Sequence, residues 1–299
     1  MHPPLHSTPA GRRAARVPIA AVCALAIALS VVGCAGRPEA PIIEPPLGST
    51  AGQTAERLNA VLPADVILLG EQHDVPAHHE IKQQVVALLA ARGVLAAVAL
   101  EMADSGVSTA SLKPSATEQQ VRNALKWSDK AWPWADYGPA IMTAVRAEVP
   151  VVGANLPREQ MRNSMSDAQL DAKLPGPALK AQQQGIRIGH CNLLPESQIA
   201  PMTRIQISRD ITMAHTVHQA AVAGKTVLLL AGNGHVDRQL GVPQHLPIDL
   251  KVKAIHLRAG DARPEEKADA FDAVWQTPAV PPVDYCEQFK KQMAPRPAS

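Results

Sequence analysis

The sequence has few aromatic residues and almost no net charge. Two Tyr, two Phe and four Trp are present among 299 residues, so the chain has few rings on which nucleic-acid bases could stack. The 29 basic residues are nearly balanced by 27 acidic ones, which gives a formal charge of +2 and no field that would attract a polyanion. We therefore expect no nucleic-acid partner.

Cysteine is also scarce, and two of the four cysteines lie in an N-terminal segment that resembles an export signal. Residues 1–34 combine a basic start, an apolar run from 17 to 32 and the pair Gly33-Cys34. The run is short for a membrane span, and its end resembles the lipobox of bacterial lipoproteins. We expect a signal peptide over 1–34 and a lipid such as palmitate on Cys34. A plain secretory peptide or a membrane-anchored N-terminus is the alternative.

The remaining cysteines are Cys191 and Cys286. An exported protein folds in an oxidising compartment, where two leftover cysteines commonly pair. We predict a disulfide between them. A free buried thiol is the alternative.

One α/β domain is predicted after the leader. Residues 35–56 are rich in Pro and Gly without an apolar period, as in a flexible tether, and the domain is expected over 57–290, before a disordered tail over 291–299. Short apolar runs without polar alternation indicate a mainly parallel β-sheet flanked by α-helices. These runs span residues 65–70, 93–100, 149–154, 225–232, 250–257 and 271–278.

Two of the predicted helices have polar residues on or beside their apolar stripes. In the helix expected from 77 to 92, His78 projects close to the stripe, whereas His79 is expected to face solvent. A longer helix, from about 195 to 223, has Arg209 and Asp210 inside its stripe. Because an unpaired buried charge is costly, these two charges should meet partners or a ligand in the interior.

Ionisable side chains follow several of the predicted strands. Two apolar runs are each followed by Gly, two residues and His, which places Glu71 and His73 after one run and His235 after another. Glu101 follows a third run and Asn155 ends a fourth. Ligands of open parallel sheets bind beyond the carboxyl ends of the strands, so these side chains should share one pocket. The alternative is that each His is only a satisfied turn residue.

Imidazole and carboxylate are the groups that hold first-row transition metals. Glu71, His73, Glu101 and His235 are therefore the candidate ligands of a Zn, Mn or Co ion.

Three of the four tryptophans and Tyr137 lie within residues 116–145. This segment is a candidate lid over a large apolar ligand, with the Tyr137 oxygen available to iron, since phenolate is one of the axial ligands of haem. The alternative is a helical hairpin that uses its aromatic rings for packing.

Several motifs in order resemble those of a known family. The segments "LLGEQHDVPAHHEIKQQVVALL", "VALEM", "WPWADYGPAI", "VPVVGANLPREQMR", "HCNLLP", "QISRDITMAHTV" and "LLLAGNGHVDRQLGVPQHL" resemble successive motifs of the ChaN-like haem-binding uptake lipoproteins. That family is grouped with the Tiki, TraB and erythromycin-esterase-like folds. The similarity covers roughly residues 60–285.

The resemblance implies an additional helical pair beside the sheet and a role in haem-iron uptake. It also implies a lipid anchor in the bacterial cell envelope, at the outer membrane facing the periplasm, with an outer-membrane haem receptor as a partner. ChaN-type proteins bind haem at a homodimer interface, with a tyrosine on the iron and a histidine of the partner subunit nearby. Tyr137 and Tyr285 are the two tyrosines of this sequence. The candidate haem-binding residues are Tyr137, His73, His78, His235, Arg209, Asp210 and Asn155.

The wider superfamily implies a different activity for the same residues. Tiki-type members carry two Gly-x-x-His motifs with a Glu and are metal-dependent hydrolases of peptides, esters or amides. In that alternative a metal-bound water is the nucleophile, and Glu71 or Glu101 is the catalytic base. A third hypothesis is a scaffold lipoprotein whose pocket has lost its ligand.

Overall fold

The computed structural model describes residues 50–261 and 269–293. The expected signal peptide, Cys34 and most of the expected tether lie outside the described residues. Helix α1 (Thr50–Val61) overlaps the end of that tether, so helical structure begins before the predicted start of the domain. Within the two described ranges, no helix combines the length and the apolar character needed to cross a membrane.

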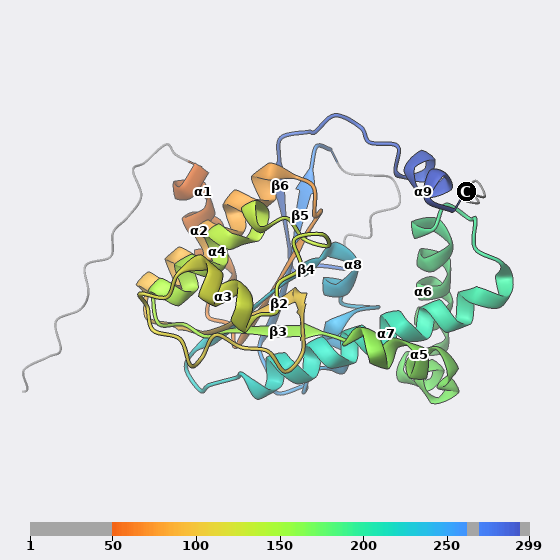
Figure 1. Cartoon of the computed structure of the whole chain (residues 1–299), viewed down its shortest axis with the longest axis horizontal. Coiled ribbons are helices and arrows are strands. Elements are labelled where there is room, and N and C mark those ends of the chain that lie inside the picture. Colours follow the sequence, from red (N-terminus) through yellow and green to blue (C-terminus); the bar gives the residue numbers. More distant parts are fainter. Residues whose placement is uncertain (1–49, 262–268, 294–299) are drawn as a thin grey trace, which may run out of the picture. The chain divides into compact units, whose positions relative to one another are not determined.

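A parallel sheet with the strand order β3-β2-β4-β1-β5-β6 forms the centre of the described domain (Figure 1). All six predicted runs are strands, and the predicted α/β class is confirmed. Every residue of β1 and β4 is buried, which explains why these runs lack polar alternation. The strands are β1 (Val66–Glu71), β2 (Leu95–Asp104), β3 (Val151–Asn155), β4 (Thr226–Gly232), β5 (Val252–Ala259) and β6 (Ala273–Thr277).

Helices α1, α2 (Pro76–Ala91) and α4 (Trp134–Arg146) cover one face of the sheet. Successive strand residues point to opposite faces, so Ile67 of β1 joins the core on this side and Val66 joins the core on the other side. Leu89 of α2 is fully buried, and burial of such a side chain stabilises the fold by roughly 2 kcal/mol. The apolar stripe predicted for this helix is therefore confirmed.

The other face is covered by α7 (Glu196–Gln219), α8 (Asn233–Val236) and the 3-10 helix η2 (Val242–His245). Met213 of α7 is fully buried in this second core. The long helix predicted near residues 195–223 is thus confirmed.

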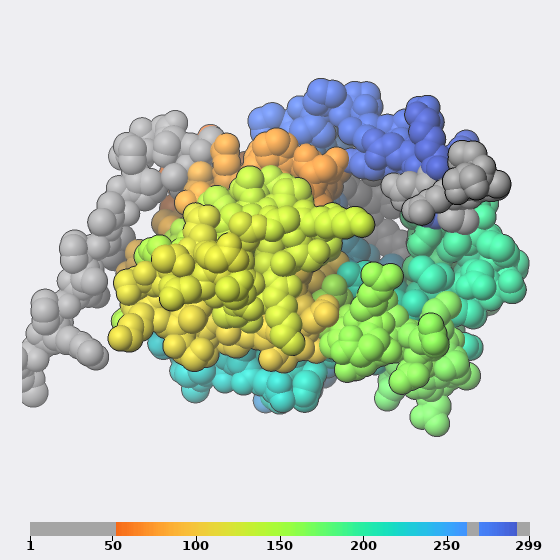
Figure 2. All heavy atoms as spheres, viewed as in Figure 1, coloured from red at the N-terminus to blue at the C-terminus, as the bar shows by residue number. Residues whose placement is uncertain are grey.

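The segment between β2 and β3 contains α3 (Glu118–Ala124) as well as α4, and it forms much of the surface seen in Figure 2 in yellow and yellow-green. Thr117 begins α3 with a capping box. Its hydroxyl accepts a hydrogen bond from the Gln120 backbone N–H at 3.3 Å, and the Gln120 side-chain oxygen accepts one from the Thr117 N–H at 2.8 Å. This cap fixes the start of the segment that holds three tryptophans.

Helices α5 (Arg158–Ser166), η1 (Ala168–Lys173) and α6 (Gly176–Gly189) pack on the first half of α7. Leu170 of η1, Leu179 of α6 and Ile207 of α7 belong to a small separate core. These elements correspond to the additional helices implied by the family resemblance.

A disulfide between Cys191 and Cys286 joins the loop after α6 to α9 (Tyr285–Met293), as predicted. The Phe289 ring packs against the His190 ring at a centroid distance of 5.6 Å. Helix α9 ends at Met293, so it extends past residue 290 into the stretch that was expected to be a disordered tail.

Candidate functional site

Polar side chains from four strands meet at the carboxyl edge of the sheet, where the sequence places them. Glu71 ends β1, Glu101 lies in β2, and Asn155 ends β3. His235 lies in α8, directly after β4. The predicted convergence is confirmed, because His73 Nε2 and His235 Nε2 lie 3.8 and 3.3 Å from the Glu101 carboxylate.

Glu101 is the centre of this group and is buried. Its Oε1 accepts a hydrogen bond from Arg209 at 2.9 Å, and its Oε2 accepts one from the Gly232 backbone N–H at 2.7 Å. Burial alone would raise the pKa of this carboxyl, but the charges of His235, His73 and Arg209 hold its pKa far below the ordinary value. Glu101 is therefore a fixed anion.

His235 lies between two buried carboxylates. Its Nδ1 is 2.5 Å from Asp210 Oδ1, and Gln206 of the same helix α7 lies 3.2 Å from the same ring nitrogen. Burial by itself lowers the pKa of His235, but Glu101 and Asp210 together raise that pKa to about 10. Burial raises the pKa of Asp210 to about 6, although the His235 charge opposes this shift.

The charges that the sequence placed inside the apolar stripe of α7 do meet partners. Arg209 donates a hydrogen bond to Asn155 Oδ1 at 2.9 Å as well as to Glu101. Asp210 is fully buried against His235. Both charges thus have the interior partners predicted for them, and they form the α7 side of the site.

A second group surrounds Glu71. Its Oε1 is 2.9 Å from His73 Nδ1, and its Oε2 forms an ion pair with Lys82 of α2. Burial would raise the pKa of Glu71, but the hydrogen bond from His73 and the charge of Lys82 lower it. The Tyr137 hydroxyl lies 3.2 Å from His73 Nδ1.

Lys82 is not among the residues predicted for the site, and the environment of His79 differs from the predicted one. Lys82 is fully buried, and it lies on the same helical stripe as His78 and Val85, so the argument applied to Arg209 would have found it. His79 was expected to face solvent, and this is wrong. Its side chain is only 14% exposed and lies 3.9 Å from Glu71 and 4.0 Å from Asp136.

His78 does not contact the cluster around Glu101. Its Nδ1 accepts a hydrogen bond from the Gln72 N–H at 3.0 Å, and its Nε2 is 3.2 Å from Thr277 Oγ1 of β6. Burial lowers the pKa of His78 to about 4. The ring is therefore neutral and both of its nitrogens have partners, as in a structural histidine.

Tyr137 and His73 differ in their exposure to solvent. Tyr137 is only 1% exposed, and the rings of Trp127 and Trp132 pack against it at 5.7 and 5.8 Å. Burial and the nearby Glu71 carboxylate raise the pKa of this phenol above its ordinary value. The His73 side chain is 35% exposed, and its ring lies 4.8 Å from Trp132. His73 is thus the residue of this group that a ligand can reach.

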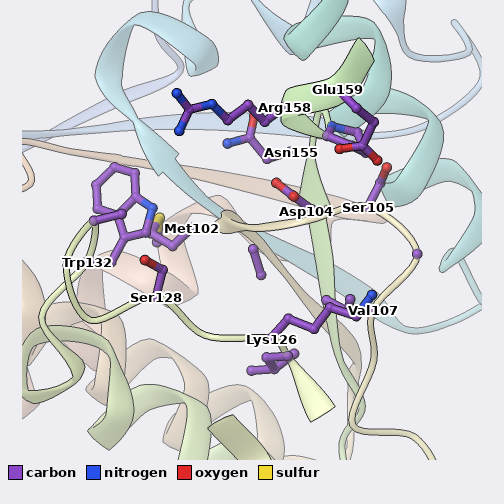
Figure 3. Close-up of a pocket in the computed structure, with 15 residues that line it drawn as sticks. Met102, Asp104, Ser105, Val107, Lys126, Ser128, Trp132, Asn155, Arg158 and Glu159 are labelled. Carbon is purple, nitrogen blue, oxygen red and sulfur yellow. The ribbon is translucent and has the colours of Figure 1, made fainter. Parts of the chain in front are cut away.

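A pocket of about 370 Å³ adjoins the cluster. Trp132 and Asn155 line the pocket. The His73 ring packs against Trp132, and Arg209 donates a hydrogen bond to Asn155, so these two residues connect the pocket to the cluster. Figure 3 shows the Arg158 guanidinium and Trp132 toward the left of the view, with Asp104 nearer its centre. The pocket combines one aromatic face with cationic and anionic groups.

The donor set does not fit a divalent metal ion. Glu71 is paired with Lys82, and Glu101 is paired with Arg209, so each carboxylate already has a cation as its partner. Among the residues that the structure describes, no group of three His, Cys, Asp or Glu side chains could hold a metal ion. Haem fits better, because it needs one accessible axial ligand and an apolar or aromatic surface, which His73 and Trp132 provide.

Comparison with known proteins identifies the family of this chain. A family described as "Haem-binding uptake, Tiki superfamily, ChaN" matches residues 57–246. A solved structure of ChaN from Campylobacter jejuni, described as showing cofacial heme binding, is 27% identical, with a TM-score of 0.61. That match covers 74% of this chain and 90% of the Campylobacter chain.

Two further solved structures match this chain less well. The type III effector HopBA1 is 16% identical over 81% of this chain and 99% of its own, with a TM-score of 0.43. A Bacillus cereus protein is 13% identical over 71% of this chain and 70% of its own, with a TM-score of 0.39. No curated protein matches the chain. Because the family match spans more than half of the chain, this protein belongs to the ChaN family of haem-binding uptake proteins in the Tiki superfamily.

Proposed function

We propose that this protein binds haem for iron uptake at the carboxyl edge of the sheet, with His73 facing the iron. The observation that carries the proposal is the partly exposed His73 imidazole, which packs against Trp132, a residue that lines the pocket, in a chain of this family. Histidine is a common axial ligand of haem iron.

The surroundings of His73 suit a ligand. Its Nδ1 is held by Glu71 at 2.9 Å, while its Nε2 is 3.8 Å from Glu101, beyond hydrogen-bond distance. Metal-binding histidines commonly use one ring nitrogen for such an outer carboxylate and the other for the metal. The Trp132 ring offers an aromatic surface to a porphyrin.

Tyr137, which the sequence offers as a ligand of iron, has a different role in this proposal. Its phenol is buried beneath the tryptophans, with its hydroxyl on His73, so it supports the histidine. Arg158 at the pocket and Arg209 beside Glu101 are cations that suit the carboxylates of haem.

We also propose that the protein acts as a lipid-anchored homodimer in the bacterial cell envelope, at the periplasmic side of the outer membrane. The leader ending at Cys34 supports the anchor, and the disulfide between Cys191 and Cys286 suits an oxidising compartment. An outer-membrane haem receptor is the partner that this role requires. Cell fractionation with and without Cys34→Ser tests the anchor, and a soluble wild-type protein would contradict it.

Hemin titration of the purified full-length protein tests haem binding. We expect a Soret band with wild type and an affinity more than about tenfold weaker in His73→Ala, since even outer-shell partners of a metal ligand contribute that much. His215→Ala is the matched control, because His215 is exposed on α7. Absence of a Soret band in wild type would refute the proposal.

Metal analysis of the same sample tests the hydrolase alternative, and light scattering with hemin tests the dimer.

A further inference from the structure

Lys82 is a buried cation in a position where an apolar residue would suffice for packing. Its side chain is 0% exposed, and it lies on the face of α2 that also buries Val85, Val86 and Leu89. Taking an ammonium group out of water is costly unless a partner compensates it. A lysine here therefore requires an explanation other than burial of apolar surface.

The charge of Lys82 is held by two groups. The ammonium forms an ion pair with Glu71 Oε2, and it lies 3.9 Å from the centre of the Tyr137 ring, in a cation–π contact. Both contacts are buried, since Glu71 and Tyr137 are 2% and 1% exposed. Lys82 thus fixes one carboxylate oxygen of Glu71 at a set place in the core.

The second carboxylate oxygen of Glu71 contacts a more exposed residue. Glu71 Oε1 is 2.9 Å from His73 Nδ1, and His73 is the exposed end of this chain of contacts, at 35%. Other groups compete for Glu71. His79 Nδ1 lies 3.9 Å from Oε2, so a carboxylate released from Lys82 could turn toward His79 and away from His73.

We propose that Lys82 is a positioning residue that, through Glu71, fixes the orientation of the His73 ring and directs its Nε2 to the ligand. The inference rests on the proposed function for the identity of that ligand as haem. It does not rest on that function for the orientation of the ring, which is a property of the protein alone. Glu71 is the outer contact that holds the ring, and loss of such a contact to a metal-binding histidine changes metal affinity about 10- to 100-fold.

Lys82→Met tests the inference in the full-length protein, because methionine keeps the length and apolar character of the side chain. The first measurement is the ¹H–¹⁵N NMR spectrum of the histidine rings without hemin. We expect one His73 tautomer, with hydrogen on Nδ1, in wild type and averaged ring signals in Lys82→Met. The second is hemin titration, in which we expect about 10- to 100-fold weaker binding and a changed ferric spin-state spectrum.

Three variants make the result specific. Ile81→Val removes one methylene from the same helix without touching Glu71, and it should leave the His73 signals and the haem spectrum unchanged. In a His73→Ala background, Lys82→Met should have no further effect on hemin affinity. If Lys82→Met fails to fold because Glu71 is left as an unpaired charge, Lys82→Met with Glu71→Gln removes that charge, and the His73 signals should again be averaged.

The outcomes separate the two proposals. Wild type that binds no hemin, with His73 signals that change in Lys82→Met, refutes haem binding and supports the role of Lys82. A hemin-binding wild type whose His73 signals, affinity and spectrum are the same in Lys82→Met overturns the role of Lys82 and leaves haem binding intact.

Discussion

His235 Nδ1 lies 2.5 Å from Asp210 Oδ1 in the interior of the protein. Asp210 is 0% exposed and His235 is 5% exposed, so each charge needs a buried partner of opposite sign. The pair connects α7 to the end of β4, and it holds the histidine against Glu101. The paired histidine is therefore structural as well as part of the site.

Asp210→Asn should destabilise the protein by roughly 3 kcal/mol at pH 7, because it leaves His235 without a buried counter-charge on one side. Urea unfolding measures the difference. Asp171→Asn is the control, since Asp171 and its partner Arg204 are both partly exposed, and we expect a loss of less than about 1 kcal/mol. Equal losses in the two variants would contradict the role of the buried pair.

The effect of Asp210→Asn should depend on pH. The pKa of His235 is raised to about 10 in the folded protein, above its ordinary value, so its charge stabilises the fold fully below the ordinary pKa. This contribution is lost as pH rises through the folded pKa. The stability gap between wild type and Asp210→Asn should therefore narrow between pH 7 and pH 10, and a constant gap would argue against a charged His235.

His78 should make the fold sensitive to acid. Its pKa is lowered to about 4 by burial, so the unfolded chain takes up a proton at a higher pH than the folded one. The contribution of His78 to the free energy of unfolding is fully present above about pH 6.5. It is lost as pH falls toward 4, by up to roughly 3 kcal/mol. Urea unfolding at several pH values should show a smaller acid-induced loss in His78→Gln, and equal losses in the two proteins would refute the prediction.

The disulfide should hold α9 to the helices beside the sheet. Cys191 and Cys286 are separated by 95 residues, and loss of a native disulfide typically costs about 2–4 kcal/mol. We expect the double variant Cys191→Ser, Cys286→Ser to unfold at lower urea concentration and to be cut by protease near residues 278–284. Wild type treated with a dithiol reductant should behave in the same way. A variant as protease-resistant as wild type would show that noncovalent contacts alone retain α9.

The sequence predicts most of this fold because the informative patterns are local. Fully apolar runs such as residues 226–232 become buried strands, and Arg209 inside an apolar stripe indicates an interior partner. Exposure depends on distant segments, and this is where prediction failed. Tyr137 looked available to a ligand, yet two tryptophans cover it. His79 looked solvent-facing, yet Glu71 and Asp136 lie on either side of it.

Gly232, the first residue of the second Gly-x-x-His motif, offers a test of how His73 is placed. A Cβ atom at Gly232 would lie 2.8 Å from His73 Nε2 and 3.5 Å from Glu101 Oε2. The first of these distances is closer than van der Waals contact allows, so Gly232→Ala should displace the His73 ring. Because metal affinity falls about 10- to 100-fold when the support of a ligand is disturbed, we expect a comparable loss of hemin affinity.

Gly234 provides the matched control two residues away. A Cβ atom at Gly234 would meet nothing within 4 Å, so Gly234→Ala should bind hemin like wild type and change stability by no more than about 0.5 kcal/mol. Hemin titrations compare the affinities of the two variants, and an unfolding curve shows that each variant is folded. If Gly232→Ala folds and binds hemin as tightly as Gly234→Ala, then His73 is not the residue on which haem binding depends, because a displaced ring could not present Nε2 to the iron equally well.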